Sequence, residues 1–138
     1  MAYQAYFANR VTKEEGGRMS FRSREKGRKG ELELAEVFRT MGYTARRTQQ
    51  YCGSNGDSDI TVDELPGLLI ECKRVERLNI DEAMSKAKQD AAAQEKTPMV
   101  CHRKNGGDWM LTVPLAQLHT FVERVQRGMA QRVAGSQG

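Results

Sequence analysis

Apolar residues recur at the spacing of an α-helix in three stretches of this chain. The first covers residues 24–41 and ends before a glycine, as helices commonly do. The second opens on Asn79 and Glu82, which resemble a helix-capping pair, and runs to about residue 94. The third covers residues 114–127. The apolar stripes of the predicted helices consist of Leu34, Val37, Phe38 and Met41, then Ile80, Ala83, Met84, Ala87 and Ala91, and finally Leu115, Leu118, Phe121, Val122, Val125 and Met129.

Shorter stretches between these helices have the composition of β-strands. The predicted strands cover residues 43–48, 58–62, 67–73, 98–103 and 109–113. A Pro-Gly turn joins the second strand to the third, and an Asn-Gly-Gly loop joins the fourth to the fifth. The element order α-β-β-β-α-β-β-α predicts an α/β domain with a central, mixed, five-stranded sheet flanked by helices.

The length of the chain limits it to one domain of ordinary size. Its 138 residues suffice for one hydrophobic core, and we assign residues 23–133 to the domain. Residues 1–22 show no sustained period and are interpreted as a basic N-terminal arm, and residues 134–138 as a disordered tail. No apolar run approaches the ~18 residues of a membrane span, and the N-terminus lacks the apolar segment of a signal peptide. We therefore expect no membrane association and a cytoplasmic location.

Positive charge is concentrated near the N-terminus. Residues 1–30 contain eight Lys or Arg and three acidic residues, whereas the rest of the chain contains fourteen basic and fifteen acidic residues. A basic segment of this kind predicts a polyanionic partner. The alternative is a solvated, partly disordered arm or leader that binds nothing.

Acidic and basic side chains converge where two predicted strands meet. The period of two places Glu71 and Lys73 on one face of their strand, and Asp59 begins the neighbouring strand. On the preceding helix, Glu31 lies at the edge of the apolar stripe, where a carboxylate needs a cationic partner. That partner could equally be a basic side chain, such as Arg46 or Lys73, in a purely structural ion pair.

These residue types are the ones that bind Mg²⁺ beside a phosphate. Magnesium prefers hard oxygen ligands, usually one or two carboxylates together with water and substrate phosphate. A nearby lysine would add positive charge at the phosphorus. The alternative is a partly buried network of Asp59, Glu71 and Lys73 that only closes one end of the sheet.

The order of these motifs resembles the PD-(D/E)XK nuclease superfamily. Glu31 is followed by Ser58-Asp59-Ile60 and then by Ile70-Glu71-Cys72-Lys73, with Ser58 standing where the superfamily name has proline. Within the superfamily, the Lys26–Glu31 stretch and the Arg46-Arg47 pair resemble archaeal-type and phage-encoded Holliday junction resolvases. The resemblance covers roughly residues 23–113 and implies a restriction-endonuclease-like fold.

The resemblance also implies a role for each site residue. Asp59 and Glu71 would bind Mg²⁺, for which Mn²⁺ would substitute, and Glu31 would complete the site through a water or a second ion. Lys73 would orient the attacking water or stabilise charge on the scissile phosphate. Asp57 lies on the same side of the strand as Asp59 and could replace or supplement it as a ligand.

The function implied by the resemblance is structure-selective cleavage of branched DNA. Because resolving a four-way junction needs two nicks on symmetry-related strands, we expect a homodimer, with Leu32 as one candidate for its surface. If the gene belongs to a phage, the expected compartment is the host cytoplasm. The alternatives are a related nuclease that acts on flaps, ends or mismatched duplex, and a DNA-binding module that keeps the fold without catalysis. The residues predicted to contact DNA phosphates are Arg24, Lys26, Arg28, Lys29, Arg46, Arg47, Arg74, Arg77, Lys86 and Lys88.

Overall fold

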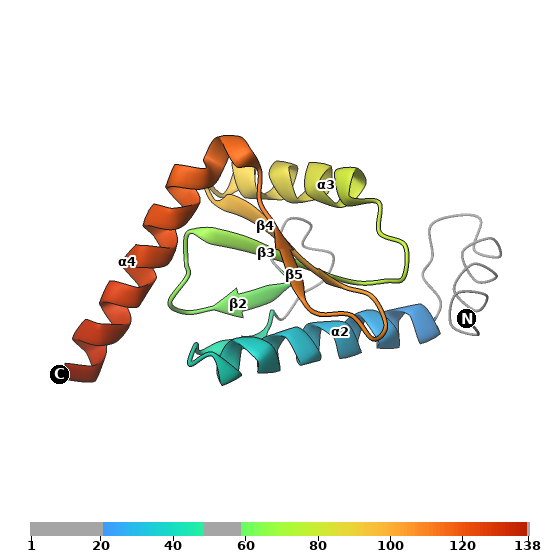
Figure 1. Ribbon diagram of the computed structural model, residues 1–138, viewed down its shortest axis with the longest axis horizontal. Coiled ribbons are helices and arrows are strands. Elements are labelled where there is room, and N and C mark those ends of the chain that lie inside the picture. The colour runs from blue at the N-terminus through green and yellow to red at the C-terminus, as the bar shows by residue number, and fades with distance from the viewer. Residues whose placement is uncertain (1–20, 49–58, 138) are drawn as a thin grey trace.

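A computed structural model describes the backbone of residues 21–48 and 59–137, with side chains for residues 24–48 and 59–131. Its elements lie in the predicted order (Figure 1). Most of the predicted N-terminal arm lies outside the described residues, as do Asp57 and Ser58. The elements are α2 (Phe21–Thr40), β1 (Ala45–Arg47), β2 (Ile60–Val62), β3 (Leu68–Arg74), α3 (Ile80–Ala93), β4 (Thr97–Arg103), β5 (Met110–Thr112), the short 3₁₀ helix η1 (Leu115–Gln117) and α4 (Leu118–Gln137).

The five strands form one mixed sheet in the order β1-β2-β3-β4-β5, which confirms the predicted fold class. Strands β3 and β4 are parallel, and each of the other neighbouring pairs is antiparallel. Parallel neighbours need a crossover connection, and α3 provides it. Helix α2 covers one face of the sheet and α3 the other (Figure 1). In the described part of the chain, no helix has the length and apolar character needed to cross a membrane.

Alternation along β3 divides the core between the two faces of the sheet. Leu68 and Ile70 are buried in the cluster that includes Leu34 and Phe38 of α2. Leu69 points the other way, into a cluster with Val100 and three alanines of α3, which are Ala83, Ala87 and Ala91. The predicted period of two is therefore confirmed, and it places Glu71 and Lys73 on the α3 side.

Helix α3 begins where the capping pair predicts. The side-chain oxygen of Asn79 accepts a hydrogen bond from the backbone amide of Glu82 at 3.1 Å. This bond satisfies one of the amides that a helix leaves unpaired at its N-terminus. The cap fixes the start of the helix that packs against the Glu71 side of β3.

The apolar stripe of the last helix is buried only along one edge. Phe121 and Val125 pack against the core, but Leu118 and Met129 are exposed, which differs from the prediction of one core-facing stripe. The reason is that α4 stands at one end of the sheet and does not lie across its face (Figure 1). The helix also continues to Gln137 and so includes residues that the sequence analysis placed in a tail.

Helix α4 packs closely against the backbone of the turn between β2 and β3. A Cβ atom added to Gly128 would lie 1.8 Å from the backbone oxygen of Glu64. One turn earlier, the guanidinium of Arg124 donates hydrogen bonds to the Gly67 carbonyl at 2.8 Å and to the Thr97 hydroxyl at 3.0 Å. The position of α4 thus depends on having no side chain at residue 128.

We predict opposite effects for alanine at two helical glycines. Gly128→Ala should lower the free energy of unfolding by ~1–3 kcal/mol, because α4 must move away from the turn. Gly27→Ala is the matched control in α2, where an added Cβ meets nothing within 4 Å. It should raise the free energy of unfolding by up to ~1 kcal/mol through helix propensity. Urea unfolding of both variants tests the contact, and equal stabilisation by both would contradict it.

Candidate active site

The backbone of β3 holds Asp59 at the start of β2. The Asp59 amide donates a hydrogen bond to the Ile70 carbonyl at 2.9 Å, and the Asp59 carbonyl accepts one from Thr48 at 3.0 Å. The Asp59 carboxylate oxygen Oδ2 then accepts a hydrogen bond from the Cys72 amide at 2.9 Å. Since Ile60 pairs with Ile70, Asp59 stands opposite Glu71 on the neighbouring strand.

Glu71 is a buried carboxylic acid without a hydrogen-bond donor. Its side chain is 1% exposed, and neither carboxylate oxygen has a hydrogen-bond partner among the described residues. The nearest cation is the ammonium of Lys86 on α3, whose Nζ lies 3.8 Å from Oε2. Burial, and then the charge of Asp59, raise the pKa of Glu71 to about 8, although Lys86 and Lys73 act in the opposite direction.

Glu31 reaches the same site from α2 and is paired with an arginine. The Nε atom of Arg47, on β1, donates a hydrogen bond to Oε2 of Glu31. Burial, the largest effect, raises the pKa of Glu31, and the negative charge of Asp59 adds to it, whereas the hydrogen bond from Arg47 and the charge of Lys73 lower it. The partner of Glu31 is therefore Arg47, the neighbour of the Arg46 suggested from sequence.

The four predicted site residues thus lie within electrostatic reach of one another. Asp59 raises the pKa of both Glu31 and Glu71, and Lys73 lowers the pKa of both. The thiol of Cys72, which points toward α2, also has its pKa raised, first by burial and then by Asp59 and Glu31. The three carboxylates of Glu31, Asp59 and Glu71 therefore share this part of the molecule with the cations of Arg47, Lys73 and Lys86.

The chemistry of the site fits a hard divalent cation. Among the described residues, no three His, Cys, Asp or Glu side chains form a ready-made metal cluster. Mg²⁺ does not require one, because it is commonly held by one or two carboxylates and keeps several waters. The two donor-free oxygens of Glu71 beside Asp59 are the buried polar atoms that such an ion would satisfy. Asp57, the other candidate ligand, lies outside the described residues.

A second acidic residue of α2, Glu33, organises a network that the sequence analysis did not predict. Its oxygen Oε1 accepts hydrogen bonds from Arg103 of β4 and, at 3.2 Å, from the indole Nε1 of Trp109. Its oxygen Oε2 lies 3.4 Å from Nε of Arg74, an ion pair without hydrogen-bond geometry. Glu33 therefore ties α2 to the ends of β3 and β4, two residues from Glu31.

The basic residues predicted to bind DNA differ in how accessible they are. Arg46 is paired with Asp63 at 2.7 Å, and Arg28 lies 3.8 Å from Glu25, both at the surface. The Arg74 side chain is 23% exposed, pairs with Glu33 and packs against the backbone of Gly30. These contacts restrict its access to a DNA phosphate. Lys26 is partly buried, and burial lowers its pKa, with a smaller contribution from Arg74. Exposed side chains are found at Arg24, Lys29, Arg77, Lys86 and Lys88.

Comparison with known proteins shows the family to which the chain belongs. Residues 22–135 match the family model described as "Phage putative PDDEXK endonuclease", and the chain belongs to this family. It is therefore a nuclease of the PD-(D/E)XK type, as the motifs predicted. The chain is also similar to the solved structure of Hjc from Archaeoglobus fulgidus, a Holliday junction resolvase from an archaeal hyperthermophile. That match has 19% sequence identity and a TM-score of 0.47, over 64% of this chain and 72% of the other. No curated protein matches the chain.

The raised pKa of Glu71 predicts a pH dependence of stability in metal-free protein. The unfolded chain releases this proton near pH 4.5, whereas the folded protein keeps it until about pH 8. The contribution of Glu71 to stability should therefore be greatest below about pH 4.5 and should decline by up to ~1.4 kcal/mol per pH unit as the pH rises toward 8.

Unfolding titrations of wild type and Glu71→Gln across this window test the effect, since the variant should lose the decline. Glu36→Gln is the matched control, because Glu36 is an exposed glutamate on α2. Parallel stability curves for wild type and Glu71→Gln would show that burial does not perturb Glu71.

Proposed function

We propose that the protein is a Mg²⁺-dependent endonuclease that cuts branched DNA, and that its substrate is the four-way Holliday junction. The observation that carries the catalytic part is the buried, donor-free carboxylate of Glu71 beside Asp59. A buried carboxylate without a hydrogen-bond donor lowers the stability of the folded protein unless a cation or a proton neutralises its charge. A divalent ion bound next to a DNA phosphate would satisfy this requirement.

In this proposal Asp59 and Glu71 hold the ion, and Glu31 joins the site through a water or a second ion. When bound, Mg²⁺, or Mn²⁺ in its place, would polarise the phosphate and lower the pKa of a coordinated water. Asp59 is suited to a ligand role because the Cys72 amide fixes its carboxylate in place through the oxygen Oδ2. The rigid backbone at this point positions the carboxylate before substrate arrives.

Lys73 supplies the positive charge that the phosphate needs. Its positive charge lowers the pKa of both Glu31 and Glu71, so it acts on both sides of the acidic pair. We infer that Lys73 stabilises negative charge on the scissile phosphate or orients the attacking water. Lys86, more than half exposed at 3.8 Å from Glu71, is able to contact the same DNA strand.

Arg47 is assigned a role that changes when DNA binds. Without DNA its guanidinium is bonded to Glu31, although the arginine side chain is 42% exposed. A DNA phosphate competes well for a guanidinium, because it accepts two parallel hydrogen bonds from it. We propose that the phosphate takes Arg47 from Glu31, which leaves the Glu31 carboxylate free to serve the ion.

The preference for branched DNA rests on the sequence motifs and on the distribution of charge. The stretch from Lys26 to Glu31 and the pair Arg46-Arg47 resemble those of resolvases, and exposed basic side chains lie on α2, β1 and α3. Contacts of this kind position a DNA backbone without reading its sequence. Cutting two symmetry-related strands further implies a homodimer. Action on flaps, ends or mismatched duplex is the alternative within the same enzyme class.

A junction-cleavage assay tests the proposed reaction. Purified protein should make paired, symmetrical nicks in a mobile-core four-way junction when Mg²⁺ or Mn²⁺ is present, with little cutting of linear duplex or flaps. Glu71→Gln and Asp59→Asn should each reduce cutting at least ~100-fold, because removing even an outer-shell partner of a metal ligand costs 10–100-fold. Both variants should still bind the junction. Binding without cutting by wild type would instead identify a DNA-binding module, and equal cutting of flaps would identify the alternative nuclease.

The proposed exchange at Arg47 is tested by the affinity for Mn²⁺ in the absence of DNA. Arg47→Met should bind Mn²⁺ about tenfold more tightly than wild type in calorimetry, because no cation competes for Glu31. Arg46→Met is the matched control, since it removes the same charge from the adjacent residue, which is paired with Asp63. Both variants should bind the junction more weakly than wild type. Equal Mn²⁺ affinity in the two variants would exclude a specific role for the Glu31–Arg47 pair.

A further inference from the structure

A cavity of about 340 Å³ lies at the ends of strands β3 and β4, next to the candidate active site. Its walls come from the segment that follows β3, from the end of β4 and from the turn into β5. His102 lines the cavity and is paired in register with Lys73 on the neighbouring strand. Because neighbouring strands are only ~5 Å apart, the cavity adjoins the residue proposed to act on the scissile phosphate.

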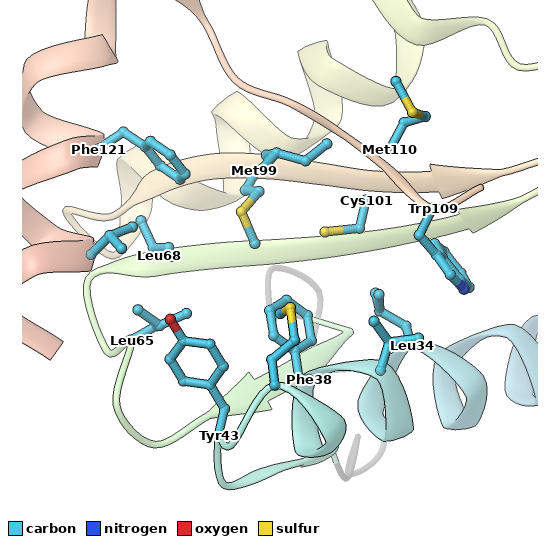
Figure 2. A pocket seen from close by; sticks show the side chains of 14 residues that line it. Leu34, Phe38, Tyr43, Leu65, Leu68, Met99, Cys101, Trp109, Met110 and Phe121 are labelled. Carbon is cyan, nitrogen blue, oxygen red and sulfur yellow. The ribbon is translucent and has the colours of Figure 1, made fainter. Parts of the chain in front are cut away.

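The side chains that line this cavity from β4 and β5 lie on the α3 side of the sheet. Val100 packs on the α3 side, so alternation along β4 puts His102 on that side as well. Met110 pairs in register with His102 and points to the opposite side of the chain from Trp109, which packs against the core on the α2 side (Figure 2). His102 and Met110 therefore face the same side of the sheet as Lys73.

Two of the charged side chains around the cavity are already paired with other groups of the protein. Arg103 donates hydrogen bonds to the Gly107 carbonyl at 2.7 Å and to Glu33. The carboxylate oxygen Oε1 of Glu76 accepts a hydrogen bond from the Asn105 amide at 2.7 Å. The other two charged residues of the lining have opposite signs and are exposed to solvent. This distribution of charge favours an uncharged ring in the cavity over a phosphate.

The uncharged walls of the cavity are suited to a planar ring. Val75, Leu78 and Met110 provide apolar surface, and His102 provides an aromatic ring. Nε2 of His102 is hydrogen-bonded to the Thr112 hydroxyl at 2.9 Å, which fixes the orientation of the imidazole. Burial lowers the pKa of His102 and so favours the neutral ring. Nucleic-acid bases stack on aromatic side chains, histidine included, and tolerate apolar neighbours.

Hydrogen bonds fix the shape of the cavity before any ligand binds. The Val75 amide donates to the Arg103 carbonyl at 3.1 Å, which continues the pairing of the two strands past the end of β3. In the turn to β5, the Gly107 amide donates to the Lys104 carbonyl at 2.9 Å, and Gly106 has a φ of 72°, a conformation that glycine adopts readily. A preformed cavity binds its ligand at a lower cost in conformational entropy.

We propose that this cavity binds one unpaired nucleobase of the DNA, close to the phosphate that Lys73 contacts. The inference rests on the proposed function, because the assigned role of Lys73 determines where the DNA backbone would pass. The cavity volume lies at the lower end of the ~300–1,000 Å³ found for small-molecule sites, as a single nucleoside requires.

A base-binding cavity in this place would contribute to the selection of branched DNA. Extruding a base from the helix costs least where the base is mismatched, damaged or already unpaired. A site that accepts an extruded base beside the scissile phosphate would therefore favour branched or interrupted DNA over a continuous duplex. Basic side chains alone do not provide this preference, because they contact the backbone of any DNA.

The test is equilibrium binding of the full chain to three DNA duplexes in metal-free buffer, measured by fluorescence anisotropy. One duplex is fully paired, one carries a single extra adenine, and one carries an abasic site in place of that adenine. The abasic bulge interrupts the helix in the same way but has no base. Wild type should bind the adenine bulge at least ~5-fold more tightly than the abasic bulge, because a stacked base adds to affinity. Equal affinity for the two bulges would overturn the inference.

Substitutions at the cavity locate the bound base. His102→Ala should abolish the preference for the adenine bulge, whereas His102→Phe should retain it through stacking. His119→Ala is the matched control and should change nothing, since His119 is the other histidine of the chain and is exposed on α4. Met110→Ala should also weaken the preference. Leu111→Ala should not, because Leu111 is similarly exposed, at 51% against 59%, but does not line this cavity.

Circular dichroism checks that each variant is folded. A preference for the adenine bulge that survives both His102→Ala and Met110→Ala would place the base elsewhere and overturn the inference. The binding test needs no cutting, so its outcome is separate from that of the junction-cleavage assay. Preference for the adenine bulge without junction cutting would support the cavity and reject the nuclease reaction. Junction cutting with equal affinity for the two bulges would support the nuclease reaction and reject the cavity.

Discussion

The hydrogen bond from the Cys72 amide to the Asp59 carboxylate joins the two strands that carry the proposed metal ligands. It holds Asp59 directly opposite Glu71, whose own carboxylate is buried and has no donor among the described residues. Burial raises the pKa of Glu71, and repulsion by the Asp59 carboxylate opposite it raises the pKa further. The surrounding contacts serve to keep this arrangement in place. Asn79 fixes the start of α3 on one side, and Glu33 ties α2 to the strands on the other.

The sequence was sufficient to predict the order of the elements and the two faces of β3. These features follow from local rules, since alternation along a strand and a capping residue depend on neighbours a few positions away. Leu69, Glu71 and Lys73 were assigned to one face because of this alternation, and the fold agrees. The ends of strands were predicted less well, as β1 and β5 are each three residues long. Pairing with a neighbouring strand decides where a strand ends, and composition does not reveal it.

The sequence alone did not predict contacts between side chains that are far apart in the chain. Glu33 and Arg103 are 70 residues apart, and nothing in the pattern of α2 shows that its Glu33 side chain meets β4 and Trp109. Likewise Arg46 and Arg47 are adjacent in sequence, and only the register of β1 decides that Arg47 meets Glu31 while Arg46 meets Asp63. Helix α4 shows a limit of the hydrophobic pattern itself. Its amphipathic pattern predicts one core-facing stripe, but only Phe121 and Val125 pack against the core, while Leu118 and Met129 are exposed.

The contact between Cys72 and Asp59 gives the protein a built-in reporter of its own site. An amide proton that is bonded to a carboxylate responds to the charge on that carboxylate, through both its chemical shift and its rate of exchange with solvent. In most of a sheet, amides bond to carbonyls, whose charge does not change. The amide of Cys72 is bonded to a carboxylate that faces Glu71, so a proton or a cation that enters this pair alters the bond. A single peptide group in the middle of β3 therefore makes the state of the acidic pair visible by NMR spectroscopy, without any added label near the site.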